Sequence, residues 1–188
     1  KTIRQEELLG VERLFSNPTA VFSTDAGKWT LGAGSSYEIF CFQKPSEGFI
    51  WEGLLTLEGM GKFGLVCDMD REGNGYYISF NVSNGQVLIR AWGFNPLNNR
   101  QNFIFNDLQS GFFTPGEGRS FRFSLIRYGH YIELSIDDEV KLTLIDYTYS
   151  GNYIGLYTAS SLISLQDSEL KTLEEPEEEY ASQEEAQV

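Results

Sequence analysis

Short segments in which apolar and polar side chains alternate run along most of the chain. In the segment that begins at Ser120, for example, Phe121, Phe123 and Leu125 occupy every second position, with polar residues between the first three. A period of two places alternate side chains on opposite faces of a β-strand, whereas an amphipathic helix needs a period near 3.6. This periodicity predicts an all-β fold in which one face of each strand packs into a core.

Turn sequences rich in Gly, Pro and Asn separate these segments. Ser83-Asn84-Gly85-Gln86 is predicted to be a two-residue hairpin turn, because Asn-Gly tolerates the positive φ values that such a turn needs. Asp137-Asp138-Glu139 is expected to form the tight turn of another hairpin. The regular spacing of about 8–12 residues predicts a sandwich of about 12 antiparallel strands.

The acidic residues are unevenly distributed. The chain has 27 Asp and Glu against 14 Lys and Arg, a net charge of -13, but residues 174–188 hold seven Glu and no basic residue. Residues 1–173 therefore carry a net charge of only -6. We expect a linker or short helix over 1–18, a β-sandwich over 19–173 and a disordered acidic tail over 174–188, because a block of like charges repels itself. The acidic balance argues against nucleic acid or an anionic membrane surface as a partner.

Other parts of the composition exclude further classes of site. One His and two Cys in 188 residues cannot supply a His/Cys zinc cluster. No apolar run approaches the roughly 18 residues of a membrane span. Cys41 and Cys67 each lie in an apolar segment, and a disulfide and two buried thiols both remain open. The chain opens with Lys1 and has no signal peptide, so we expect a processed chain or a piece of a longer one.

Three stretches carry a resemblance to a known fold. They are a D-x-x-G-x-G-Y-Y run at residues 70–77, an R-Y-G-H-Y-I-E-L-S-I-D-D hairpin at residues 127–138, and a G-N-Y-I-G-L-Y-T-A-S-S run at residues 151–161. Together they resemble the concanavalin A-like (laminin-G-like) jelly-roll sandwich. More narrowly, the chain resembles the C-terminal sandwich of glycoside hydrolase family 32, the β-fructosidases and levanases, and the related levan-binding carbohydrate modules.

This resemblance implies a non-catalytic module. The lead-in at residues 11–18 would join an upstream catalytic propeller, and the three acidic signatures of that propeller are absent from this sequence. The module would bind a carbohydrate such as fructan or brace the catalytic domain. Two alternatives stay open: a structural or protein-interaction sandwich, and a free-standing hydrolase of concanavalin-like fold. A secreted or cell-surface location is slightly favoured over others.

Catalysis by this chain alone is not expected. Glycoside hydrolysis needs two carboxylates facing one another across the sugar. The nearest candidates are Asp68, Asp70 and Glu72, and this stretch runs into a Gly-rich turn. The same three residues are candidate calcium ligands, but Ser79 stands where an EF-hand loop requires a bidentate Glu, and no cofactor is expected. His130 lies at a turn without a nucleophile partner.

Strand parity selects the candidate sugar-binding residues. A sugar site pairs aromatic rings with polar side chains that bind hydroxyl groups. Arg90 and Trp92 are predicted to share the polar face of their strand, and Asp68 and Asp70 the face opposite Cys67 and Met69. The predicted set is Glu52, Asp68, Asp70, Tyr77, Arg90 and Trp92. The sequence also contains one short glycosylation pattern, Asn81-Val82-Ser83.

Overall fold

The structure is a computed structural model that describes residues 1–8, 11–13, 20–59, 61–96, 102–116 and 119–174. These residues contain 13 β-strands and two short 3₁₀ helices, η1 (Gln5–Glu7) and η2 (Asp25–Gly27). The strands are β1 (Thr2–Arg4), β2 (Glu12–Arg13), β3 (Val21–Ser23), β4 (Lys28–Gln43), β5 (Gly48–Leu57), β6 (Lys62–Met69), β7 (Gly75–Asn81), β8 (Gln86–Phe94), β9 (Phe103–Phe112), β10 (Ser120–Tyr128), β11 (Tyr131–Ile136), β12 (Glu139–Ile145) and β13 (Tyr153–Leu173). The predicted all-β antiparallel sandwich is confirmed.

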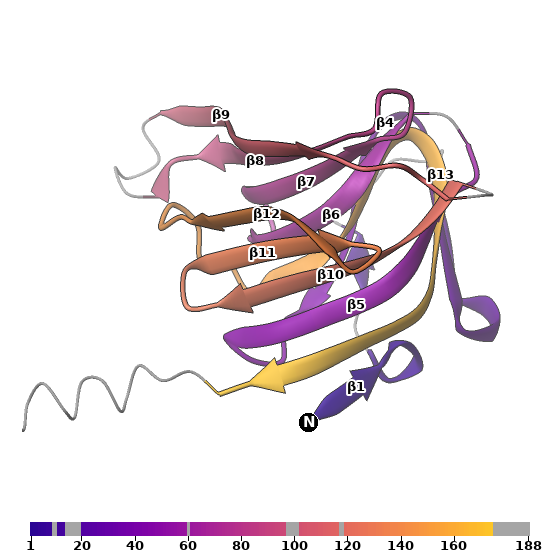
Figure 1. The fold of residues 1–188 in the computed structure, drawn as a ribbon, viewed down its shortest axis with the longest axis horizontal. Helices are drawn as coiled ribbons and strands as arrows, with labels where there is room; N and C mark the ends of the chain where they lie inside the picture. Colours follow the sequence, from indigo (N-terminus) through magenta and orange to yellow (C-terminus); the bar gives the residue numbers. More distant parts are fainter. Residues whose placement is uncertain (9–10, 14–19, 60, 97–101, 117–118, 175–188) are drawn as a thin grey trace, which may run out of the picture.

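The strands form one hydrogen-bonded sheet that folds over into two layers (Figure 1). Strands β12, β11, β10 and β5 follow one another in the first layer, which we call the β5 layer. Strands β6, β7, β8 and β9 follow one another in the second, which we call the β7 layer. Within the described residues the strand pairs are antiparallel, which suits a sandwich in which each layer has one buried face and one outer face.

The two long strands β4 and β13 belong to both layers and connect them. One edge of β13 pairs with β4 from Tyr153 to Gln166. The other edge pairs with β6 over residues 153–159 and with β5 over residues 163–173. A bulge with Ser160 at φ 54° lets β13 bend without breaking, and β4 follows it through a matching register shift.

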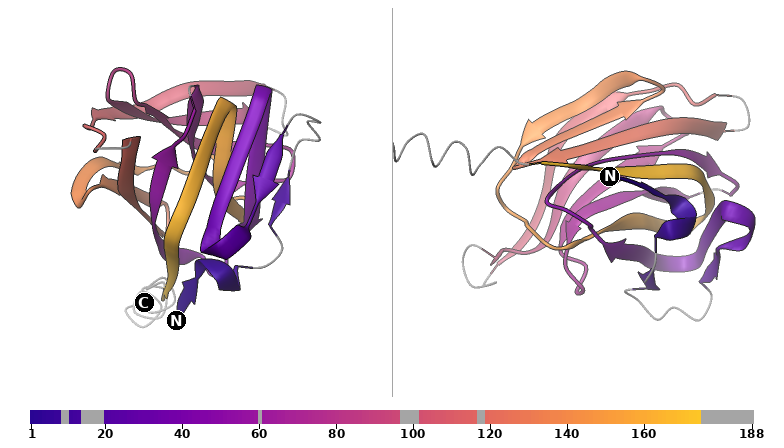
Figure 2. Two further views of the ribbon diagram at one scale, coloured as in Figure 1. Left: turned by 90° about the vertical axis from the view of Figure 1, so that its right-hand side faces the viewer. Right: turned by 90° about the horizontal axis from the view of Figure 1, so that it is seen from below.

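The opposite side of the sandwich is closed between the edge strands β9 and β12. The side chain of Gln109 spans the gap: its Nε2 donates to the Thr143 carbonyl oxygen at 2.9 Å, and its Oε1 accepts from the Thr143 backbone nitrogen at 2.7 Å. Figure 2 shows the two layers from the side and from below. An amide side chain thus replaces a backbone ladder at this edge.

The core between the layers is unusually aromatic. Phe121 of the β5 layer lies 4.8 Å from Phe80 and 6.3 Å from Phe63 of the β7 layer, measured between ring centroids. Trp51 contacts Phe123 edge to face at 5.1 Å. The predicted inward positions in the segment that begins at Ser120 are therefore confirmed, and these tilted ring pairs fill the interior.

The N-terminal segment belongs to the sandwich. β1 pairs with the end of β13, and β2 pairs with β4. Gln5 is buried, and its side chain donates to the carbonyl oxygens of Gly27 and Leu165 and accepts from the Ser168 backbone nitrogen. The sheet therefore begins well before the boundary expected at residue 19, with η1 as a short helical turn. Residues 14–19 and the acidic segment at 175–188 lie outside the described residues.

The two predicted hairpin turns have different outcomes. Asp137 and Asp138 adopt φ values of 49° and 65°, as a tight turn between β11 and β12 requires. The β7–β8 connection is longer than predicted, because Asn81 pairs with Gln86 and four residues lie between them. The Asn81 side chain accepts from the Ser83 backbone nitrogen and so stabilises the longer turn.

The side chains around Asp68 lie on other faces than predicted, because β6 contains a bulge there. Asp68 has a φ of 48°, so the alternation breaks there: Cys67 packs in the central core, while Met69 packs in a second cluster on the outer face of the β7 layer. The expectation that Cys67 and Met69 share a face is therefore wrong. Cys41 and Cys67 are both buried free thiols, and burial raises the pKa of the Cys67 thiol, which keeps it protonated.

The Asp68 carboxylate forms an ion pair that joins the two layers. Its Oδ2 accepts from Arg127 Nε at 2.9 Å and from Nη2 at 2.5 Å, and both side chains are at most 4% exposed. Arg127 continues the inward parity of β10, so the pair lies inside the sandwich at the strand ends. Removing one partner of an ion pair buried to this degree is costly, because the remaining charge is then buried without a counter-charge or water around it.

We expect Asp68→Asn to lower the free energy of unfolding by about 3–5 kcal/mol, because it leaves the Arg127 guanidinium buried without a counter-charge. Urea unfolding followed by tryptophan fluorescence measures this loss. The matched control is Asp107→Asn, which breaks the more exposed pair with Arg90 and should cost less than about 1 kcal/mol. A double change to Asp68→Asn and Arg127→Met should recover part of the loss, and equal losses for the two single Asp variants would contradict the assignment.

Candidate functional site

A hollow of about 350 Å³ opens on the outer face of the β7 layer. Its lining comes from three strands of this layer and from the two shared strands. The lining residues are Tyr37 of β4, Tyr157 of β13, Tyr77 and Ser79 of β7, Arg90 and Trp92 of β8, and Phe105 of β9. We call this feature the aromatic hollow. Three of the six predicted sugar-binding residues lie in it: Tyr77, Arg90 and Trp92.

Small side chains at one row of the sheet create the space. Gly64 of β6 pairs with Tyr157 on one side and with Ser79 on the other. A Cβ atom at Gly64 would meet the Ile78 carbonyl oxygen at 1.7 Å and the Tyr157 ring at 2.9 Å. Only glycine therefore fits at this position, and the absence of a side chain there lets the Tyr157 ring lie down across β6.

Two tyrosines form the floor of the aromatic hollow. Tyr77 and Tyr157 contact each other at 5.4 Å between centroids, and Tyr77 contacts Trp92 at 5.5 Å. The Tyr77 hydroxyl donates to the Gly73 carbonyl oxygen at 2.7 Å, and the Tyr157 hydroxyl shares a hydrogen bond with Ser79. Burial raises the pKa of both hydroxyls well above the usual value for tyrosine, so both stay neutral.

Arg90 supplies the positive charge of the aromatic hollow. Its Nε donates to Asp107 Oδ1 at 2.6 Å, and its guanidinium lies 4.3 Å from the centroid of the Phe105 ring. Within the described part of the chain no hydrogen bond engages its two Nη groups. The pairing with Asp107 and the stacking on Phe105 hold the guanidinium plane in place, so the Nη groups can donate to a ligand with little loss of entropy.

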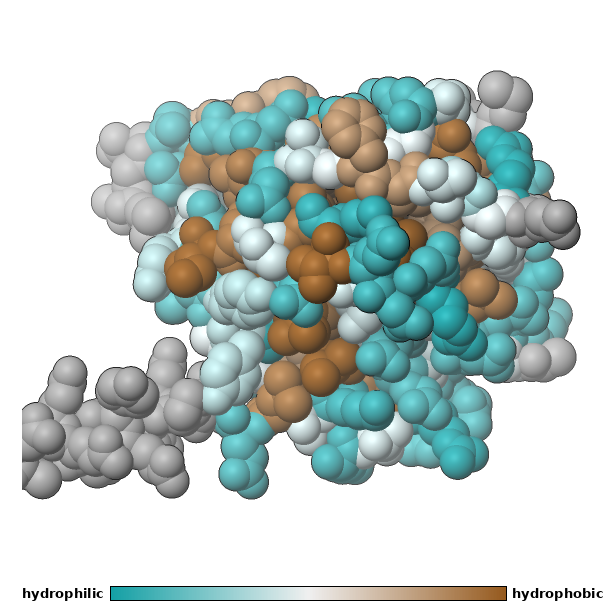
Figure 3. Space-filling model, in the orientation of Figure 1, coloured by the Kyte–Doolittle hydropathy of each residue, from teal (hydrophilic) through white to brown (hydrophobic). Residues whose placement is uncertain are grey.

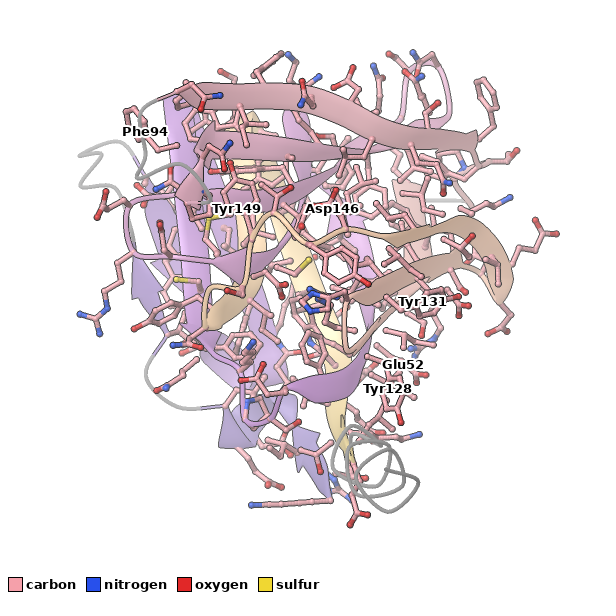
Figure 4. The ribbon with its side chains drawn as sticks, turned by 90° about the vertical axis from the view of Figure 1, so that its left-hand side faces the viewer. Glu52, Phe94, Tyr128, Tyr131, Asp146 and Tyr149 are labelled. Carbon is pink, nitrogen blue, oxygen red and sulfur yellow. The ribbon has the colours of Figure 1, made fainter. Side chains whose placement is uncertain are left out.

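A second group of polar side chains lies at one end of the sandwich and has a structural role. Tyr76 donates to Asp146 across the two layers, and the Tyr149 backbone nitrogen donates to the Tyr76 hydroxyl at 3.2 Å. Figure 4 looks onto this end and labels Asp146 and Tyr149 on the connection from β12 to β13. Burial, followed by the charges of Asp70 and Asp146, raises the pKa of Tyr149 to about 12. This group and the Asp68–Arg127 pair fasten the layers together.

The acidic residues that the sequence singled out are separated from the aromatic hollow. The Asp68 carboxylate is inside the sandwich, and Asp70 caps its own turn, where Oδ1 accepts from the backbone nitrogens of Glu72 and Asn74 at 2.8 and 3.0 Å. Among the described residues, no group of three or more His, Cys, Asp or Glu side chains could hold a metal ion, so the suggestion of calcium gains no support from the geometry.

Three further predicted positions lie elsewhere. Glu52 is on β5, where it pairs with Ser124 and Glu169, so it belongs to the outer face of the other layer (Figure 4). His130 sits at the β10–β11 turn with its ring 4.2 Å from that of Tyr147, in keeping with the expected turn role. Asn81 of the glycosylation pattern is exposed at the end of β7.

Parity along single strands could not identify the rest of the aromatic hollow. Ser79 shares the face of Tyr77 and could have been included on that ground. Phe105 faces Trp92 across β8 and β9, a pairing that depends on a bulge in β9. Tyr37 and Tyr157 reach the aromatic hollow through the long β4–β13 pairing, and nothing near them in the sequence reveals it.

No protein-family model and no curated protein matches this chain. Solved structures do match. The Bacillus subtilis carbohydrate binding module CBM66 superposes with a TM-score of 0.70 at 12% identity, over 87% of this chain and 97% of that one. Xylan β-1,4-xylosidase from Bacillus halodurans and β-fructofuranosidase from Aspergillus kawachii match with TM-scores of 0.58 and 0.54, at 14% and 13% identity, over 83% and 87% of this chain.

These matches confirm the resemblance that the sequence motifs indicated. The chain has the β-sandwich fold of carbohydrate-binding modules and of sandwich domains in glycoside hydrolases. It covers only 35% of the xylosidase and 28% of the fructofuranosidase, so it corresponds to one part of each enzyme. Among the described residues, no helix is long and apolar enough to span a membrane.

The buried floor of the aromatic hollow should make the protein sensitive to alkali. Because the folded-state pKa of Tyr157 is raised, the stability that its neutral hydroxyl contributes is complete below about pH 10 and is lost as the pH rises above it. At pH 11 this loss should be on the order of 1 kcal/mol relative to pH 8, measured as the shift in urea unfolding. Tyr157→Phe should remove that part of the shift. Tyr147→Phe, at an exposed ring, should keep it, and identical pH profiles for both variants would refute the assignment.

Proposed function

We propose that this domain is a non-catalytic carbohydrate-binding module whose ligand occupies the aromatic hollow. The observation that carries the proposal is the lining itself: aromatic rings from five strands surround one oriented guanidinium, and three tyrosines and Ser79 add hydroxyl groups. Sugar rings have an apolar face that stacks on aromatic side chains and a rim of hydroxyl groups that bind polar ones. The fold of carbohydrate-binding modules supports the same conclusion.

Binding, and not hydrolysis, suits the chemistry of this site. A glycosidase needs a pair of carboxylates about 5–10 Å apart on either side of the bond that breaks. The described lining of the aromatic hollow contains no carboxylate, and the Asp107 carboxylate beside it is held by Arg90. With the Arg90 charge balanced in this way, the aromatic hollow is suited to an uncharged sugar.

The proposal extends to the kind of sugar and to the protein context. We propose a fructan such as levan or inulin as the first ligand to test, and an upstream catalytic domain as the context in which the module works. The sequence motifs at residues 127–138 and 151–161 motivate both choices. The match to part of a β-fructofuranosidase supports them at the level of fold.

Binding can be tested by calorimetry against levan, inulin and xylan. Arg90→Ala should weaken binding about tenfold or more, because hydrogen bonds from a charged donor contribute about 1.5–3 kcal/mol. Arg122→Ala is the matched control, since Arg122 is exposed on β10 of the other layer and should leave the affinity unchanged. Silence toward all three polysaccharides, or equal effects of the two variants, would contradict the proposal.

One observation favours a second role, that of an interaction domain. Val140 and Ile145 of the edge strand β12 and Tyr147 just beyond it are all more than half exposed. Figure 3 shows apolar side chains among polar ones on the face that contains this strand. Such a surface could brace a neighbouring domain. If no glycan binds, this role becomes the leading explanation of the fold.

A further inference from the structure

Exposed aromatic side chains continue beyond the aromatic hollow on the same outer face. Phe103 of β9 and Phe94 of β8 are cross-strand partners, and they are 46% and 45% exposed. Tyr37 and Phe105, on opposite walls of the aromatic hollow, are 48% and 58% exposed. Four large rings that are about half exposed contribute little to the core. Their position together on one face therefore indicates a binding surface.

Ring-to-ring contacts join most of these side chains into one row. Successive members lie 4.9–6.1 Å apart between centroids. The row runs from Tyr37 through Tyr157, Tyr77, Trp92 and Phe103 to Phe94. Trp92 and Phe94 each meet Phe103 edge to face, at 89° and 85°, so the less exposed Trp92 supports the ring beyond it.

The far end of the row is held in position by the β6–β7 turn. Asn74 Oδ1 accepts from the Phe94 backbone nitrogen at 3.0 Å, and Asn74 Nδ2 donates to Asp70 Oδ2 at 2.8 Å. Gly93 allows this close approach, since a Cβ atom there would lie 2.3 Å from Asn74 Oδ1. The Asp70 turn thus acts on the row by positioning, which reduces the entropy lost when a ligand binds.

We propose that the aromatic hollow and the pair Phe94 and Phe103 form one continuous track that binds the interior of a glycan chain, several sugar units at a time. This inference rests on the carbohydrate-binding function proposed above and adds the mode of recognition. A single sugar ring is about the size of one aromatic ring, so a terminal sugar would leave most of the row unused. A longer segment would use all of it.

The polar groups beside the row favour a glycan chain over an apolar protein surface. Ser79, Arg90 and Asp107 lie on the same face and offer hydroxyl, guanidinium and carboxylate groups among the rings. A glycan chain likewise alternates apolar ring faces with hydroxyl groups. The chemistry of the track and of such a chain therefore match over several units.

The first test compares ligands of different length. Calorimetry would measure the affinity for levan fragments of two to six fructose units, with inulin and xylan fragments of the same lengths in parallel. For the series that binds, the affinity should rise at least about tenfold from two units to six. Phe103→Ala should flatten this rise and leave the affinity for the shortest fragment within about twofold. Arg90→Ala should weaken all lengths alike.

A matched control uses another exposed ring of the same strand. Phe112 lies at the opposite end of β9, is even more exposed than Phe103 and has no ring partner in the described part of the chain. Phe112→Ala should therefore preserve the dependence on length. A flat dependence for the unchanged protein, or equal behaviour of the Phe103 and Phe112 variants, would overturn the track.

The second test separates the interior of a chain from its ends. Levan fractions of two different mean lengths are saturated with the protein, and the number of molecules bound per gram is measured by sedimentation. Interior binding predicts the same number per gram for both fractions, whereas end binding predicts a number proportional to the chain ends. Binding in proportion to the ends overturns the track but leaves carbohydrate binding intact, while absence of binding to every probe overturns both.

Discussion

The antiparallel pairing of β4 with β13 is the constraint on which the rest of the structure depends. These two strands run through both layers, so their bends fix how far apart the layers lie and how they face each other. The bulge at Ser160 also reverses the side-chain parity of β13. Ile163 and Leu165 point into the core beyond it, whereas Tyr157 before it points to the outer face. One bent strand thus supplies both the core and the floor of the aromatic hollow.

Polar contacts at the strand ends also connect the two layers, in addition to the bent strands β4 and β13. The Asp68–Arg127 pair joins β6 to β10. The Tyr76–Asp146 hydrogen bond joins β7 to the residue that follows β12. Both contacts therefore connect the β7 layer with the β5 layer. Because such groups are expensive to bury unpaired, they favour one arrangement of the layers over others. The acidic residues near residue 70 therefore serve the architecture, although their spacing in the sequence suggested sugar or metal binding.

More of the fold than of the site could be predicted from the sequence. Alternation in β10, β11 and β12 correctly gave antiparallel strands and the inward faces, because period-two patterning is a local signal. It failed where a single residue with positive φ resets the parity, as at Asp68, and where one strand continues through a bend, as at Ser160. Glycine is the residue that most often adopts a positive φ, but these two positions carry Asp and Ser. The sequence therefore does not show where the alternation of faces is interrupted. The alternation alone also gave no indication that residues 2–4 and 12–13 pair with distant strands.

The same physical distinction explains the site. Arg90 and Trp92 could be selected because two unusual residues alternate within one strand, and that parity holds in the structure. Tyr37, Tyr157 and Phe105 join them only through pairings between strands far apart in the sequence. The buried ring of Tyr157 and the partly buried ring of Trp92 contact the exposed rings of Tyr37 and Phe103. If this face binds a ligand as proposed, stability and recognition are coupled across it: the more buried ring anchors the sheet and holds its exposed neighbour at a fixed angle.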